Sequence, residues 1–199
     1  MRDLERALEE IGAIKDQLAR GARFRGFGPT TFVATSVLVS AAAVVQTLIP
    51  PASSDAYLAL WVAVAAASCG IISVEMIGRS RRLHTHLADE MLRAAVEQFL
   101  PAGLVGALLT LIVWRLAPQS LWMLPGLWQV VFGLGVFASA RFLPGPMWQV
   151  GAWYLTTGLG CLALFHGPAA FAPWVMGVPF GVGQLMVAAI LHLDQRSHD

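Results

Sequence analysis

Six apolar runs of about 20 residues follow one another along this chain of 199 residues. A helix rises about 1.5 Å per residue, so each run is long enough to cross the ~30 Å hydrocarbon core of a bilayer. The runs occupy residues 29–49, 56–77, 99–116, 121–140, 145–165 and 171–193. Proline pairs or Gly-Pro steps interrupt the chain between several of them. The sequence therefore predicts an all-α integral membrane protein, built as a bundle of six transmembrane helices.

The composition excludes a water-soluble fold. Only 13% of the residues are charged, whereas soluble domains carry about 25%. Six runs of this length use about 120 positions, which leaves no room for a separate soluble catalytic domain. We expect a cytoplasmic arm at residues 1–25, a transmembrane domain at 26–193 and a short cytoplasmic tail at 194–199.

The N-terminal arm has the pattern of an amphipathic helix. Its apolar residues recur at steps of three and four, which gives one apolar stripe: Leu4, Leu8, Ile11, Ile14 and Leu18. Three placements fit this pattern. The helix could lie on the membrane surface, pack on the protein's own cytoplasmic loops, or form a short coiled-coil seam with a second copy.

The basic residues predict the orientation in the membrane. With six spans, the two termini and the 2–3 and 4–5 connections share one side. That side holds Arg2, Arg6, Lys15, Arg20, Arg23, Arg25, Arg79, Arg81, Arg82, Arg93, Arg141 and Arg196, and the other side holds only Arg115. Because positively charged loops stay in the cytoplasm, both termini are expected to be cytoplasmic.

The 2–3 connection is the most polar stretch of the chain, and two interpretations of it stay open. A metal ion could be held by His86 with Asp89 or Glu90, three and four residues later on one helix face, with His84 or Glu97 nearby. Alternatively the stretch is a basic elbow that contacts anionic lipid headgroups through Arg79, Arg81 and Arg82. Of the two interpretations we favour the basic elbow, and we predict no metal centre in this stretch.

Two further charged residues lie at the cytoplasmic ends of spans. Glu75 has Arg79 one helical turn later, which favours a local ion pair. Arg141 closes the fourth span. It could anchor the turn at lipid phosphates or pair with an acid, for which Glu75, Glu90 and Glu97 are the candidates.

Nothing in the sequence indicates catalysis. It contains no HExxH motif, no glycine-rich phosphate loop and no carboxylate near the middle of a span. Cys69 and Cys161 show no CxxC spacing. A net charge of +1 gives no reason to expect nucleic-acid binding. We predict a protein that is not an enzyme, with no catalytic residue and no cofactor.

The tryptophan, glutamine and glycine residues of the spans each lead to a separate prediction. Rings near span ends predict either an interfacial belt or an aromatic cavity: Trp122, Trp128, Trp148, Trp153 and Trp174. Glutamines at depth are expected to bond helices to one another: Gln46, Gln129, Gln149 and Gln184. Eight glycines predict that the last three spans pack most tightly, so Gly133→Leu should abolish stable purification and Ala42→Leu in the first span should be tolerated better.

One segment carries a resemblance to a known family. Leu-Pro-Gly-Leu-Trp at 124–128, Gly133, Gly135, Ser-Ala-Arg at 139–141 and Pro144 are similar to a family of uncharacterised bacterial six-span membrane proteins. Its genes often neighbour one for a winged-helix transcriptional regulator. The resemblance implies a bacterial inner-membrane protein with a short helix before the first span. It implies no particular activity.

Two functions fit these features. The first is a non-enzymatic sensor or accessory module that presents its cytoplasmic face to a protein partner or to a second copy of itself. The second is a small transporter or carrier for an apolar or neutral solute, with a pocket lined by Trp, Gln and Thr of the last three spans. A cavity of at least ~300 Å³ would favour the second.

Overall fold

The computed structural model describes the backbone of residues 28–83 and 86–196 and the side chains of residues 28–78 and 96–196. All regular structure in these residues is helical, which confirms the predicted all-α class. Six long helices are present: α2 (Pro29–Leu48), α3 (Ser54–Leu83), α4 (His86–Leu116), α5 (Leu124–Ser139), α6 (Trp148–Leu164) and α7 (Pro173–Arg196). Four short 3-10 helices lie between them: η1 (Pro118–Met123), η2 (Ala140–Phe142), η3 (Gly145–Met147) and η4 (Gly167–Phe171). The predicted arm at 1–25 lies outside the described residues.

Within the described part of the chain, five segments are long and apolar enough to cross a membrane: Pro29–Leu48, Ser54–Gly78, Val96–Leu116, Pro118–Phe142 and Gly167–Arg196. This is consistent with a membrane-embedded protein. Helix α6 is not among these five segments. It has 17 residues, which is about 26 Å of helix.

Helices α3 and α4 extend well beyond the predicted second and third spans. The second run ends at 77, whereas α3 continues to Leu83. The third run begins at 99, whereas α4 already begins at His86. Pro101 lies in the first turn of the predicted third span, 99–116, but in the middle of α4. Because no Gly or Pro stands between residues 86 and 100, the helix continues through polar sequence that hydropathy alone assigns to a loop.

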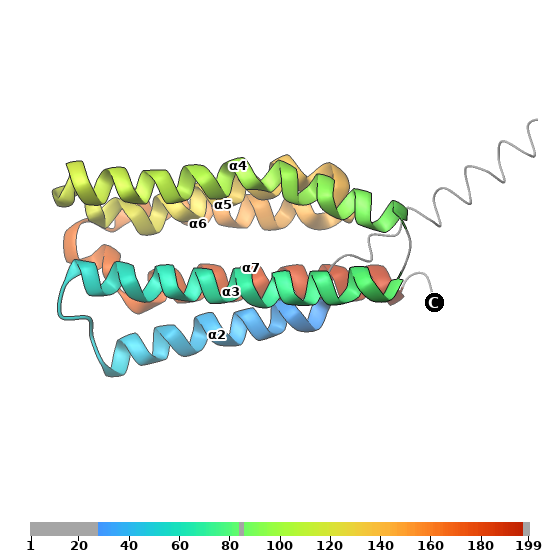
Figure 1. The fold of residues 1–199 in the computed structure, drawn as a ribbon. Helices are drawn as coiled ribbons and strands as arrows, with labels where there is room; N and C mark the ends of the chain where they lie inside the picture. Colours follow the sequence, from blue (N-terminus) through green and yellow to red (C-terminus); the bar gives the residue numbers. More distant parts are fainter. Residues whose placement is uncertain (1–27, 84–85, 197–199) are drawn as a thin grey trace, which may run out of the picture.

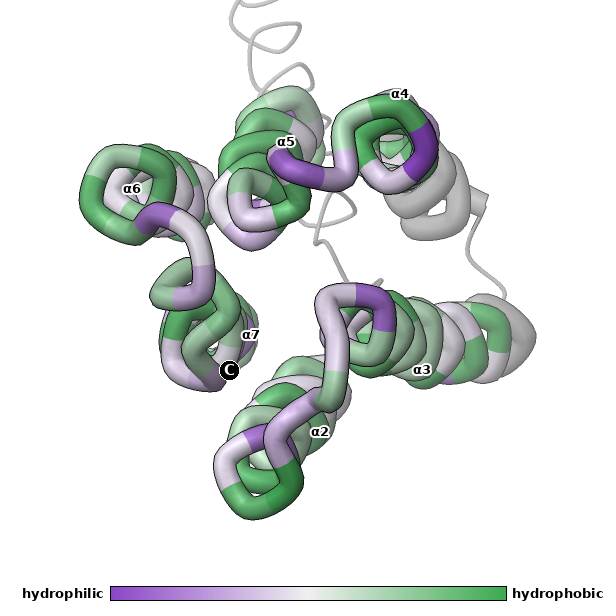
Figure 2. Tube along the Cα trace, turned by 90° about the vertical axis from the view of Figure 1, so that its left-hand side faces the viewer, coloured by the Kyte–Doolittle hydropathy of each residue, from purple (hydrophilic) through white to green (hydrophobic). Residues whose placement is uncertain are grey.

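The long helices run side by side, and the two ends of the described chain lie at the same end of the bundle (Figure 1). We call this the terminal end. The opposite end, formed by residues 49–53, 117–123 and 165–172, is the connection end. Viewed along the bundle, α4, α5, α6, α7, α2 and α3 follow one another around a ring (Figure 2). The first long helix therefore packs against the last one.

Glycines allow two helix pairs to approach closely. A β-carbon on Gly158 of α6 would lie 2.8 Å from the Gly126 carbonyl oxygen of α5. A β-carbon on Gly177 of α7 would lie 2.6 Å from that of Ala43 on α2. Close packing within the last three spans is thus confirmed for α5 and α6, but α2 approaches α7 just as closely.

Ala42 on α2 is also buried, with only 7% of its surface exposed, so the better tolerance of Ala42→Leu than of Gly133→Leu stays a prediction. The motif that explains the α2–α7 contact is a spacing of four between small residues. Ser36 and Ser40 on α2 face Gly181 of α7, and the Ser36 hydroxyl donates to the Gly181 carbonyl oxygen over 2.9 Å. Small residues at this spacing bring membrane helices together.

Candidate functional site

The charged candidates of the 2–3 connection lie at the terminal end. Arg79, Arg81 and Arg82 belong to the last turns of α3, and His86 and Glu90 to the first turns of α4, while His84 falls between the described segments. The side chains of all six lie outside the described residues. Within the described part of the chain, no group of three or more His, Cys, Asp or Glu residues is placed to hold a metal ion. Glu75 is half-buried on α3.

Arg141 is exposed in η2, and its guanidinium lies 4.6 Å from the centre of the Phe142 ring. Glu97, one of its candidate partners, is exposed on α4. No ion pair joins Arg141 to Glu97. Among the residues whose side chains the structure describes, Arg141 contacts its own neighbour in the chain, Phe142.

We expect Arg141→Ala to change the thermal stability in detergent very little. An exposed cation–π contact contributes about 0.5–1 kcal/mol, which corresponds to a fall in Tm of about 3 °C or less. The measurement is thermal unfolding followed by circular dichroism, with Arg141→Lys as the charge-preserving control. A fall of about 8 °C or more would instead show that Arg141 pairs with an acid, such as Glu90.

The tryptophans divide into two groups. Trp148 and Trp174 are 54% and 49% exposed at the first residues of α6 and α7, at opposite ends of the bundle, as an interfacial belt requires. Trp128 and Trp153 instead bond between helices. The Trp128 indole donates to the Thr110 hydroxyl over 2.8 Å, and the Trp153 indole donates to the Pro179 carbonyl oxygen over 2.9 Å.

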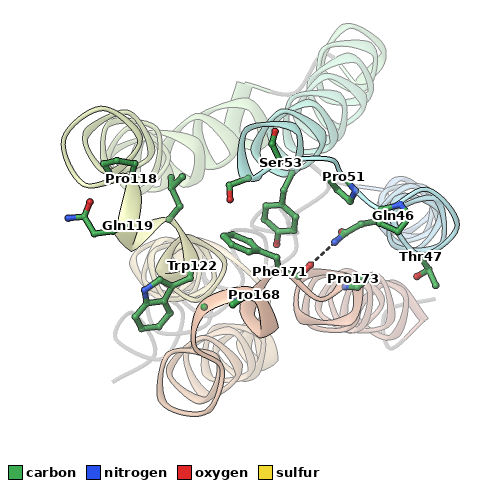
Figure 3. Close-up of a pocket in the computed structure, with 15 residues that line it drawn as sticks. Gln46, Thr47, Pro51, Ser53, Pro118, Gln119, Trp122, Pro168, Phe171 and Pro173 are labelled. Atoms are coloured by element: carbon green, nitrogen blue, oxygen red, sulfur yellow. Dashed lines mark hydrogen bonds between the residues drawn. The ribbon is translucent and has the colours of Figure 1, made fainter.

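A cavity of about 670 Å³ lies at the connection end, between the three chain connections (Figure 3). Its rim is rich in proline: Pro50, Pro51, Pro118, Pro168 and Pro173. Proline ends or begins the adjoining helices because it cannot donate a backbone hydrogen bond. Gly167, with φ of 58°, makes the turn into η4 in a conformation that favours glycine. The rim is therefore built from stiff backbone.

Gln46, Tyr57 and Phe171 form what we call the cavity floor, which joins three elements. Gln46 on α2 is only 3% exposed. Its side-chain oxygen accepts a bond of 2.9 Å from the Trp61 indole of α3, and its amide donates to the Phe171 carbonyl oxygen over 2.6 Å. The Phe171 and Tyr57 rings pack edge to face, with their centroids 4.8 Å apart. A single amide thus ties α2, α3 and η4 together. Figure 3 draws its bond to Phe171 as a dashed line.

None of the residues that line the cavity carries a formal charge at neutral pH. The polar groups near its mouth are hydroxyls and amides of Thr47, Ser53, Ser54 and Gln119, and Trp122 adds an aromatic wall. The Ser53 hydroxyl accepts from the Ala56 backbone N–H and so caps the start of α3. This lining suits an uncharged molecule with both apolar and hydrogen-bonding parts.

Proline residues in the connections between helices were a sequence signal for this cavity that hydropathy does not use. The connections that follow α2, α4 and α6 lie at one end of the bundle, and each of the three contains proline. The expected cavity was instead assigned to the last three spans. Gln46 and Thr47 of the first long helix and Tyr57 of the second contribute to it, and only Trp122 came from the group of tryptophans singled out by sequence.

The glutamines behave largely as expected. Gln46, Gln129 and Gln184 are buried and bond to other helices, with the Thr35 hydroxyl donating to the Gln184 side-chain oxygen over 3.3 Å. Gln149 is exposed.

No family model matches the chain, and no match is found among curated proteins or solved structures.

Proposed function

We propose that the chain crosses the bacterial inner membrane six times with both termini in the cytoplasm. Helix α6 and the preceding η3 together cover 145–164, about 20 residues, which is enough for a span. The described chain begins and ends at the same end of the bundle, as an even number of spans requires. The excess of basic residues at that end supports a cytoplasmic location for it. The cavity then faces away from the cytoplasm.

In this orientation, the protein is a carrier or receptor that takes a small uncharged solute from the non-cytoplasmic side. The observation that carries this proposal is the cavity of about 670 Å³, since ligand sites commonly measure about 300–1,000 Å³. Its uncharged lining favours a neutral solute, because a buried ion without a partner is costly. The aromatic groups of Tyr57, Trp122 and Phe171 favour a solute with an apolar ring or chain.

We propose binding rather than catalysis, because the residues that line the cavity offer only hydroxyls and amides as polar side-chain groups. The two ionisable groups nearby have other contacts: the His166 ring packs on Trp122, and the Asp55 carboxylate accepts a bond from the Trp114 indole. The alternative role as a sensor or accessory module depends on the arm at 1–25 and on the elbow at 79–90. A receptor of this kind could use both, with a ligand at one end and a protein partner at the other.

Three bromobenzene derivatives that differ in charge test the proposal. 4-Bromobenzyl alcohol is neutral, 4-bromobenzoate is an anion and 4-bromobenzylammonium is a cation, and bromine quenches tryptophan fluorescence. We expect saturable quenching by the alcohol, with an affinity at least about tenfold higher than for either ion, which corresponds to about 1.4 kcal/mol. Trp122→Phe should remove most of the saturable part, because Trp122 lines the cavity.

A matched pair of substitutions on α3 separates the cavity from the detergent as the place of binding. Ser54→Phe puts a ring into the cavity, since Ser54 lines it, and should abolish saturable quenching. Ser73→Phe puts the same ring on an exposed position of the same helix and should leave the quenching unchanged. Equal quenching of both variants, or quenching that never saturates, would overturn the proposal.

A further inference from the structure

Helix α7 contains a proline whose lost hydrogen bond is replaced by another helix. Pro179 lies inside α7 and has no backbone N–H, so the carbonyl oxygen of Val175, four residues earlier, receives no bond from its own helix. Val175 is 2% exposed, so water does not supply the missing donor. An unpaired buried carbonyl group costs stability.

Gln129 of α5 supplies that donor. Its side-chain amide nitrogen lies 3.0 Å from the Val175 carbonyl oxygen and 3.1 Å from the Pro125 carbonyl oxygen of its own helix. Gln129 is fully buried. On the other side of the proline, the Trp153 indole of α6 donates to the Pro179 carbonyl oxygen over 2.9 Å. Neighbouring helices commonly complete the bonds that a proline frees in a membrane helix. Here Gln129 completes the bond that Pro179 frees, and Trp153 adds a further bond one turn later.

The turn that Gln129 holds leads directly to the cavity. Val175 is two residues from Pro173, which lines the cavity, and four residues from Phe171 of the cavity floor. The Val175 backbone N–H also donates to the Ala172 carbonyl oxygen over 3.0 Å. The segment 171–175 is therefore bonded as one piece, with Gln129 at one end and the cavity at the other.

We propose that Gln129 is a positioning residue for the cavity, which fixes the Phe171–Pro173 wall through the Val175 carbonyl group. That this wall binds a ligand rests on the proposed function. The Gln129 side-chain oxygen is buried without a hydrogen-bond partner among the described residues, so the amide contributes through its nitrogen. Beyond the proline, α7 is held separately by the contact of Ser36 with Gly181.

A cycle of two substitutions tests the bond itself. Gln129→Leu removes the donor and should lower Tm by about 5 °C. Pro179→Ala restores a backbone N–H at residue 179, which can then bond to the Val175 carbonyl oxygen. In that background, Gln129→Leu should lower Tm by less than about 2 °C. Gln149→Leu, the same change at an exposed site on α6, is the control. An equal loss of Tm from Gln129→Leu in both backgrounds would overturn the proposal.

Two readouts then test positioning. Hydrogen exchange of the amides in residues 167–172, measured without ligand, should quicken at least about tenfold in Gln129→Leu and return toward the wild-type rate when Pro179→Ala is added. The affinity for 4-bromobenzyl alcohol should weaken about tenfold and recover in the same way. Unchanged exchange would show that Gln129 only stabilises α7. Failure of the wild-type protein to bind any of the three probes would overturn the proposed function, and the exchange result would still decide whether Gln129 positions this wall.

Discussion

Gly158→Leu is expected to abolish the folded bundle, whereas Gly160→Leu, two residues further along the same helix, should be purified like the wild-type protein. A β-carbon at Gly158 would lie 2.8 Å from the Gly126 carbonyl oxygen and 2.9 Å from the Gln129 β-carbon. The first of these contacts is backbone, so only a separation of α5 from α6 relieves it. A β-carbon at Gly160 meets nothing within 4 Å.

The expected cost of Gly158→Leu exceeds the ordinary cost of overpacking, which is about 1–3 kcal/mol, because two backbones must move. The separation would also strain the Gln129 bonds to α7, since Gln129 is one of the groups displaced. The measurement is the yield of monodisperse protein on size-exclusion chromatography, followed by Tm for any variant that survives. Equal behaviour of the two leucine variants would show that α5 and α6 do not pack as described.

Gln46→Leu is expected to lower the free energy of unfolding by about 2–4 kcal/mol, because two buried hydrogen bonds are lost together. The Trp61 indole N–H and the Phe171 carbonyl group would both lose their partner in a site that is almost closed to water. We expect Tm to fall by about 5–12 °C. The cavity floor should loosen with it, so that saturable binding of 4-bromobenzyl alcohol weakens as well.

A partner substitution checks the cause of this loss. Trp61→Phe removes the donor that Gln46 accepts from, so combining it with Gln46→Leu should cost less than the sum of the two single changes. Strict additivity would contradict a bond between these side chains. A Tm of Gln46→Leu close to that of the wild type would show that the amide does not hold α2, α3 and η4 together.

Much of the fold follows from local sequence. Lipid cannot hydrogen-bond to a peptide group, so an apolar run of about 20 residues has to form a helix. Pro50, Pro118 and Pro168 mark the turns at the connection end because proline cannot continue a helix. The ends of α3 and α4 were harder to predict, because polar residues without Gly or Pro continue a helix outside the membrane as readily as apolar ones.

The neighbours of each helix could not be read from hydropathy. In a soluble protein the apolar face of a helix is the buried one, but lipid is as apolar as the core of the bundle. Leu104 of α4 is 58% exposed and Val150 of α6 is fully buried, although their side chains are chemically alike. Small residues and glutamines distinguish the packed faces, as Gly177 and Gly181 do where α7 meets α2 and as Gln129 does where α5 meets α7.

The sequence by itself determined that the chain forms apolar helices, where the turns between them fall, and which end carries the basic residues. These are local properties, set by the hydropathy, backbone chemistry and charge of neighbouring residues. Only the tertiary structure decided that Gln46 joins Trp61 to Phe171, 125 residues away from it, and that Gln129 completes the backbone of α7. A glutamine in an apolar run shows that a polar partner is needed. The partner is set by the order in which the helices pack, and packing depends on contacts between distant parts of the chain.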